Sequence, residues 1–124
     1  MISSFVLHGG GELLIDGAVD RKTSPQIVAK VRELRAAGVR MRHLVCNQDR
    51  YLLGPVEEYR WVPENCFVNQ VIFTYGETVA FALETEPKVL LQRDPHLAKY
   101  TRERFNLLWA ILEQPDTSEA DERY

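Results

Sequence analysis

The sequence predicts an α/β fold in which a mixed β-sheet is flanked by helices. Two segments have the apolar spacing of helices and begin at the N-cap residues Ser24 and Asp94, short apolar strands lie between them, and Gly76 marks a tight turn. The length of 124 residues, with 45% hydrophobic and 27% charged residues, is typical of one globular domain. We therefore predict a single α/β domain over residues 1–114 and an acidic, flexible tail over 115–124.

The first half of the chain predicts strand, helix and strand in succession. An apolar segment over 2–7 predicts the first strand, which runs into the glycine triplet at 9–11. The helix over 24–37 starts with a serine cap and a proline, and a glycine follows it. Segment 39–46 then becomes increasingly apolar and predicts a core strand. A helical connection between two strands predicts that they are parallel.

The second half predicts antiparallel strands and a closing helix. A strand over 57–63 stops at a proline, and strands over 69–75 and 78–84 are joined by the turn at Gly76 and Glu77. Segment 88–92 predicts a further strand. The helix that follows Asp94 repeats its apolar residues at helical spacing, as Leu97, Tyr100, Phe105, Leu108, Trp109 and Leu112.

Ligands of such sheets collect beyond the carboxyl ends of the parallel strands. There lie the loop 8–11, after the predicted first strand, and the loop 47–49, after the second. Glycines allow a ligand to approach the backbone, while histidine, asparagine and arginine side chains supply polar contacts. We therefore predict a binding site for a small polar or anionic molecule, formed by His8, Gly9, Gly10, Asn47 and Arg60. A plain glycine turn between two short strands is the alternative.

The glycine-rich stretch is similar to parts of two functional motifs. HGGGE is similar to the oxyanion loop of lipases and esterases, but that loop acts with a serine in G-x-S-x-G, and no serine here has that context. A dinucleotide motif must open a helix, whereas Gly11 is followed by LLI. We therefore predict no catalytic residues and no enzyme. A small enzyme using His8, Glu12 and the 47–49 loop is the alternative.

His43 and Cys46 have the spacing H-x-x-C, which raises the question of a metal site. Residues three apart on a strand point to opposite faces, so these two side chains do not chelate one ion. No C-x-x-C pair is present either. We therefore expect neither a metal nor a cofactor.

The charge and the hydropathy of the chain limit its partners and its location. A net charge of −3 and a pI near 5.6 disfavour nucleic-acid binding by this chain alone, and the basic residues between 32 and 43 are interpreted as a solvated surface. No apolar run reaches the roughly 18 residues of a membrane span. Because the opening MISSF lacks the pattern of a secretory signal, we expect a cytoplasmic protein in which Cys46 and Cys66 are free thiols.

Several stretches, taken in order, resemble a known family. They are ELRAAGVRMRHLV, VEEYRWVP and the long segment QVIFTYGETVAFALETEPKVLLQRDPHLAKYTRERFNLLW. This order resembles the phospholipase D-like domain over about residues 27–112. It is most similar to the version that serves as the effector domain of TrmB-like, sugar-responsive transcription regulators. The resemblance implies that the fold is a phospholipase D-like half.

The sequence departs from this family where the family carries its chemistry. Catalytic members have H-x-K-x-x-x-x-D, in which the histidine attacks phosphorus and the lysine holds the phosphate. The resemblance places these positions on Val68, Gln70 and Tyr75, which supply neither a nucleophile nor a positive charge. After His8, the matching positions are Gly10 and Ile15. The resemblance thus implies an architecture that is retained without phosphodiesterase chemistry.

These observations predict a non-catalytic, ligand-sensing or regulatory interaction domain. The hairpin VIFTYGETVAFAL has more apolar and aromatic residues than one buried face requires. We therefore expect a homodimer with a small-molecule effector. A protein-interaction module without a small ligand is a further alternative.

Overall fold

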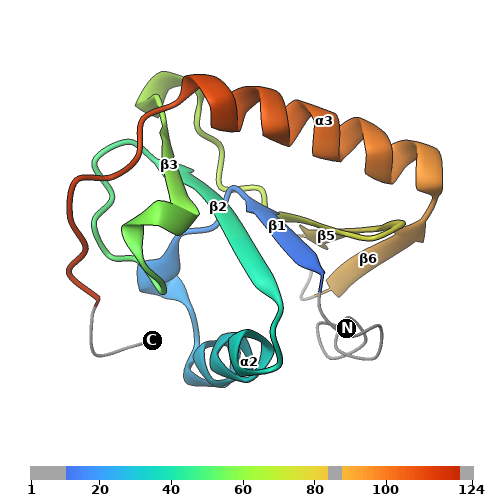
Figure 1. Cartoon of the computed structure of the whole chain (residues 1–124), viewed down its shortest axis with the longest axis horizontal. Coiled ribbons are helices and arrows are strands. Elements are labelled where there is room, and N and C mark those ends of the chain that lie inside the picture. Colours follow the sequence, from blue (N-terminus) through green and yellow to red (C-terminus); the bar gives the residue numbers. More distant parts are fainter. Residues whose placement is uncertain (1–10, 84–87, 121–124) are drawn as a thin grey trace.

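The computed structural model describes residues 11–83 and 88–120 and shows a six-stranded sheet between two helices (Figure 1). The predicted α/β class is therefore confirmed. The strands are β1 (Glu12–Asp16), β2 (Arg40–Cys46), β3 (Tyr59–Val62), β4 (Ile72–Tyr75), β5 (Thr78–Leu83) and β6 (Lys88–Arg93). The helices are α2 (Pro25–Ala36) and α3 (Pro95–Ile111), and none among the described residues is long and apolar enough to cross a membrane.

The sheet is mixed, with the strand order β3-β2-β1-β4-β5-β6. The strands β1, β2 and β3 are parallel, and β4, β5 and β6 continue the sheet antiparallel from β1. The predicted turn between β4 and β5 is confirmed, because Tyr75 pairs with Thr78 and Gly76 has a φ of 57°.

The parallel partner that the structure gives β2 is not the predicted segment. The predicted strand 2–7 lies outside the described residues, and β2 pairs in parallel with β1 on one side and with β3 on the other. The described strand β1 follows the glycine triplet. Both segments are short and apolar, and pairing partners lie far away in the sequence, so the local pattern did not distinguish them.

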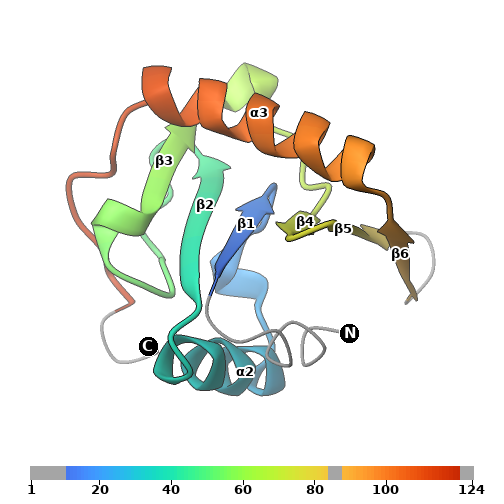
Figure 2. The same ribbon diagram turned by 45° about the vertical axis from the view of Figure 1, so that its right-hand side comes forward.

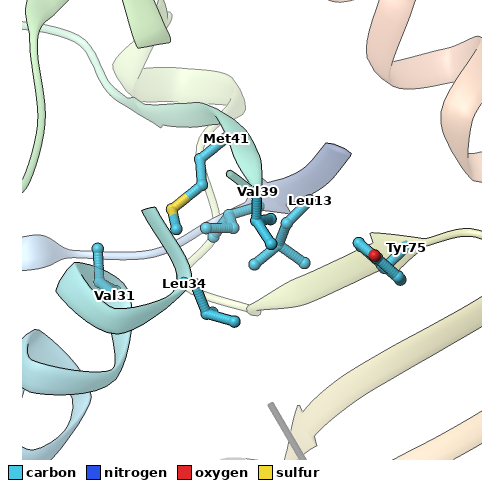
Figure 3. Close-up of a cluster of buried hydrophobic side chains, with 7 residues drawn as sticks. Leu13, Val31, Leu34, Val39, Met41 and Tyr75 are labelled. Atoms are coloured by element: carbon cyan, nitrogen blue, oxygen red, sulfur yellow. The ribbon is translucent and has the colours of Figure 1, made fainter. Parts of the chain in front are cut away.

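One hydrophobic cluster joins α2 to the sheet (Figure 3). Ser24 caps the helix by accepting a hydrogen bond from the backbone N–H of Ile27, and Pro25 occupies the first turn. The helix then presents Val31 and Leu34 to the strands. The buried members of the cluster are Leu13, Ile15, Val31, Leu34, Val39, Met41 and Tyr75.

A second cluster joins α3 to the opposite face of the sheet. Asp94 caps α3 by accepting hydrogen bonds from the backbone N–H groups of His96 and Leu97. Leu14 and Leu44 from the sheet pack with Phe105, and partly buried side chains close the layer around them. These are Val62, Leu108, Trp109 and Leu112.

The described part of the predicted flexible tail, residues 115–120, and the residues just before it contact the domain. Glu113 pairs with Trp61, and the backbone N–H of Glu119 donates to the carbonyl of Arg50. Pro115 and Ala120 are fully buried against the domain. Two small apolar side chains in a polar segment give no periodicity, so their burial was not visible in the sequence.

Candidate ligand-binding site

A cavity of about 460 Å³ lies between α2 and the sheet, on the side of the carboxyl end of β1. Its volume falls within the roughly 300–1,000 Å³ that is usual for small-molecule sites. Its walls are mostly apolar: Leu13, Ile15, Ala18, Val19, Ile27, Val31, Leu34, Val71, Phe73 and Ala82. Its polar lining consists of Asp20, Lys22, Thr23, Ser24, His43 and Asn69. We call it the α2 cavity.

His43 is the buried polar group of the α2 cavity whose hydrogen-bonding capacity is unused. Its side chain is 2% exposed, and neither Nδ1 nor Nε2 has a hydrogen-bond partner among the described residues. The ring stacks on that of Tyr59, with the centroids 4.2 Å apart and an interplanar angle of 5°. An unsatisfied buried polar group costs about 1–3 kcal/mol, so an imidazole in this state is unusual in a stable core.

The protonation state of His43 follows from its surroundings. Burial, followed by the positive charge of Arg35, lowers the pKa of the imidazole to about 3. The ring is therefore neutral near pH 7, with one nitrogen as a hydrogen-bond donor and the other as an acceptor. A group of this kind suits a ligand hydroxyl, which both accepts and donates.

A network of buried polar groups holds the loop that leads into α2. The carboxylate of Asp20 accepts hydrogen bonds from the hydroxyl of Tyr59 at 2.7 Å and from the backbone N–H of Leu53 at 2.9 Å. Burial and the neighbouring Asp20 charge raise the pKa of the Tyr59 hydroxyl well above its usual value. Because Tyr59 also stacks on His43, this network fixes the plane of the imidazole.

Arg35 and Glu58 form an ion pair close to His43. The guanidinium of Arg35 lies 2.7 Å from the carboxylate of Glu58, and it also donates to the carbonyl of Leu53 at 3.3 Å. Gly54 makes room for the pair, because a Cβ there would lie 2.6 Å from both the Arg35 and Glu58 side chains. The pair thus fixes the position of the positive charge that, after burial, contributes to the lowered pKa of His43.

The opposite wall depends on a close crossing of two chain segments. Gly17, directly after β1, has a φ of 87°, and a Cβ there would lie 2.1 Å from the carbonyl oxygen of Gln70. Only glycine fits this crossing. The side-chain amide of Asn69 donates to the carbonyl of Gly17 at 2.7 Å, which places Asn69 in the cavity lining. Gly17 stands between Asp16 and Ala18 in the sequence without any motif to mark it.

Of the predicted site residues, the structure describes Asn47 and Arg60. His8, Gly9 and Gly10 lie outside the described residues. Gly11 precedes β1 and accepts a hydrogen bond from the backbone of Arg40, which starts β2, whereas Asn47 follows the end of β2. Gly11, the last residue of the 8–11 loop, thus lies at the amino end of β1, which is the opposite end of the parallel pair from Asn47.

Arg60 also lies away from the α2 cavity. Its guanidinium lies over the ring of Trp109, 4.1 Å from the centroid, on the face of the sheet that α3 covers. Burial, and then the charge of Arg42, lower the pKa of this guanidinium. Arg60 therefore contacts the α3 side, while the cavity is on the α2 side.

The resemblance places the family's catalytic motif on Val68, Gln70 and Tyr75, and the structure describes the surroundings of these three side chains. Val68 is 72% exposed, and the side-chain amide of Gln70 donates to the carbonyl of Ala82 at 2.6 Å. Tyr75 belongs to the hydrophobic cluster between α2 and the sheet (Figure 3). His43 and Cys46 extend from opposite faces of β2, because they are three residues apart on one strand, and both thiols of the chain are free.

Comparison with known proteins gives a fold and no family. No protein-family profile matches the sequence, and the comparison with curated protein sequences finds no match either. Among solved structures, Nuc from Salmonella typhimurium, a phospholipase D family member, superposes with a TM-score of 0.64 at 12% identity, over 92% of this chain and 88% of that one. The chain therefore has a phospholipase D-like α/β fold.

A second solved structure has the same architecture. TrmBL2, described as an archaeal chromatin protein with a novel mode of DNA binding, superposes with a TM-score of 0.62 at 15% identity. The match covers 90% of this chain and 47% of TrmBL2, so this chain spans about half the length of that relative. The predicted similarity to phospholipase D-like domains and to TrmB-like proteins is confirmed at the level of the fold.

Proposed function

We propose that this domain is a non-catalytic ligand-binding domain and that its ligand occupies the α2 cavity. The observation that carries the proposal is His43, a buried neutral imidazole in the cavity wall with both nitrogens unpaired among the described residues. A ligand that hydrogen-bonds to this ring would offset the cost of burying it. The apolar lining supplies the remaining affinity.

The proposed ligand is a small, mostly apolar molecule that carries a hydroxyl group. The apolar residues of the lining favour a hydrophobic body, and the neutral imidazole favours a group that both donates and accepts. This differs from the small polar or anionic molecule predicted from the loops, because most of the α2 cavity wall is apolar.

The absence of catalysis is part of this proposal. The motif positions Val68 and Gln70 offer no nucleophile and no cation, which supports it. The enzyme alternative needs Glu12 near the 47–49 loop, but Glu12 pairs with Arg40 at the start of β2. Its carboxylate is also held by Arg42 in a two-pronged ion pair with both distances 2.9 Å.

The test compares 4-propylphenol with propylbenzene, which differ only in the hydroxyl. We expect 4-propylphenol to bind the wild-type protein about tenfold more tightly, measured by calorimetry and by thermal shift. His43→Phe keeps an aromatic ring over Tyr59 and should abolish this difference. Asn47→Ala, away from the cavity, serves as the control and should leave it unchanged. If neither compound binds, or if His43→Phe retains the preference, the proposal is wrong.

A protein-interaction function is the second candidate, and strand β6 favours it. Its side chains Val89, Leu90 and Leu91 are 43%, 54% and 48% exposed, and β6 is at the edge of the sheet. Exposed apolar edges are normally covered, and a second copy of this chain offers the same edge. We expect sedimentation to detect a dimer that Leu90→Lys dissociates; a wild-type monomer at tens of micromolar would contradict self-association.

A further inference from the structure

We infer that the ligand of the α2 cavity carries an anionic group as well as a hydroxyl, so that it is an elongated hydroxy acid with an apolar body. The inference rests on the proposed function and adds the second polar end of the ligand. It is carried by the residues at the entrance of the cavity, at the start of α2.

The entrance has one exposed cation with no acidic partner. Lys22 lines the α2 cavity, and its ammonium group forms no ion pair with any described residue. By contrast, the half-buried cation Arg35 is paired with Glu58. Lys22 is exposed while His43 is 2% exposed, so the two polar ends of the cavity differ in depth, with the cation outside and the imidazole inside.

The start of α2 contributes to the same preference for an anion. Thr23, Ser24 and Ile27 line the cavity at the first turn of this 12-residue helix, where the helix dipole is positive. The dipole by itself specifies no site. Here the unpartnered, buried His43 in the same cavity points independently to a ligand.

Asp20 is the acidic group in the lining and must be weighed against Lys22. Its side chain is 3% exposed, and its carboxylate already accepts hydrogen bonds from Tyr59 and Leu53. Those donors disperse part of its charge within the protein. A ligand anion at the exposed Lys22 side chain therefore contacts the ammonium group directly. The carboxylate of Asp20 is hydrogen-bonded to Tyr59 and Leu53 instead.

The chemistry of the ligand follows from this order of groups. In the inferred ligand, an anionic group at the entrance contacts Lys22, and an apolar body packs against the wall that includes Val31 and Phe73. A hydroxyl group at the other end hydrogen-bonds to His43. The probe 3-(4-hydroxyphenyl)propanoate has these three parts. Two matched compounds each lack one part: 4-propylphenol lacks the carboxylate, and 3-phenylpropanoate lacks the hydroxyl. A third, tyramine, carries a cationic ammonium group in place of the carboxylate.

The experiment measures the affinity of each probe by calorimetry for the wild type and for Lys22→Gln. In the wild type, we expect 3-(4-hydroxyphenyl)propanoate to bind about fivefold more tightly than 4-propylphenol, with tyramine weakest. Added salt should reduce this preference. Lys22→Gln should remove it, so that the variant binds 3-(4-hydroxyphenyl)propanoate no more tightly than it binds 4-propylphenol. Lys99→Gln, on α3, serves as the charge-matched control and should retain the preference.

The outcomes separate the two proposals. If 4-propylphenol binds in a His43-dependent manner, but the carboxylate gives no advantage or Lys22→Gln retains it, the inference of an anionic end is overturned while the proposed function stands. If tyramine binds more tightly than the hydroxy acid, the inference is likewise overturned. If none of the phenols binds the wild type, both proposals are overturned.

Discussion

The two faces of the sheet are built differently, although β1 and β2 contribute to both. Helix α3 has 17 residues, crosses the sheet and packs closely against β1, β4 and β5, whereas α2 has 12 residues and approaches the strands less closely. In Figure 2, α2 lies beneath the β1 and β2 half of the sheet, and β5 and β6 extend beyond it. The longer helix leaves a pocket of about 180 Å³ between itself and the sheet, whereas the shorter one leaves the α2 cavity of about 460 Å³.

Two neighbouring residues of β2 show the same contrast in their polar contacts. Arg42 faces α3, where it donates to Glu12 and to Asn106 and lies over the rings of Phe105 and Trp109. His43 faces α2 and has no hydrogen bond to a described residue. On the α3 side the polar group of β2 is thus bonded to its neighbours, whereas on the α2 side the imidazole of His43 has no such bond to a described residue.

The largest expected effect comes from a matched pair of leucines. Leu44 is 0% exposed on the α3 side, and Leu34 is 1% exposed but lines the α2 cavity. Leu44→Ala should lower the free energy of unfolding by about 4–5 kcal/mol, and Leu34→Ala by only about 2–3 kcal/mol, because a side chain facing a cavity has fewer contacts to lose. Urea unfolding measures both. Equal losses would mean that α2 packs onto the sheet without a cavity.

The pH dependence of stability tests the state of His43. Its pKa is about 3 in the folded protein and 6.5 in the unfolded chain, so between these values the unfolded state binds more protons. Stability therefore falls as the pH is lowered from 6.5 towards 3. When the pH is lowered from 7 to 5, we expect the protonation of this histidine in the unfolded chain to lower the free energy of unfolding by about 2 kcal/mol.

His43→Phe isolates this contribution from those of the carboxylates. The variant should be at least as stable as the wild type at pH 7, since it removes an unsatisfied polar ring, and its stability should change about 2 kcal/mol less between pH 7 and pH 5. Chemical unfolding of both proteins at the two pH values gives the difference. Parallel pH profiles would show that His43 is solvated or paired in the folded state.

The smallest expected effect concerns Arg60, which was predicted to bind ligand and lies instead against Trp109. Arg60→Gln should lower the free energy of unfolding by about 0.5–1 kcal/mol through loss of the cation–π contact. The affinity for 4-propylphenol should stay unchanged. A marked loss of affinity in this variant would place the ligand on the α3 side and remove the functional contrast between the two faces.

The sequence predicted most of the fold because its signals are local. Both helices carry capping residues and apolar spacing, and Gly76 marks the hairpin, so these elements were found close to their observed bounds. The parallel partner of β2 was misplaced, since a five-residue strand such as β1 has no local feature that selects its neighbour. The resemblance to phospholipase D-like domains supplied the architecture that local patterns did not.

The candidate site was not predictable in the same way. His43 was visible as a histidine in a strand, and its alternation correctly separated it from Cys46. Its lack of a partner depends on the distance between α2 and the sheet and on the positions of Tyr59 and Arg35, which are distant in the sequence. A cavity is a property of packing between layers, and hydrophobic periodicity carries no information on it.

The most direct test of the ligand-binding account is nitrogen NMR of the His43 ring during titration with 4-propylphenol. The account predicts a neutral imidazole at pH 7 whose Nδ1 and Nε2 signals both shift as the ligand saturates, because a hydroxyl engages the ring inside the α2 cavity. Assignment by comparison with His43→Phe identifies the signals. Saturation that leaves both signals in place, or a ring that is protonated at pH 7, would contradict the account.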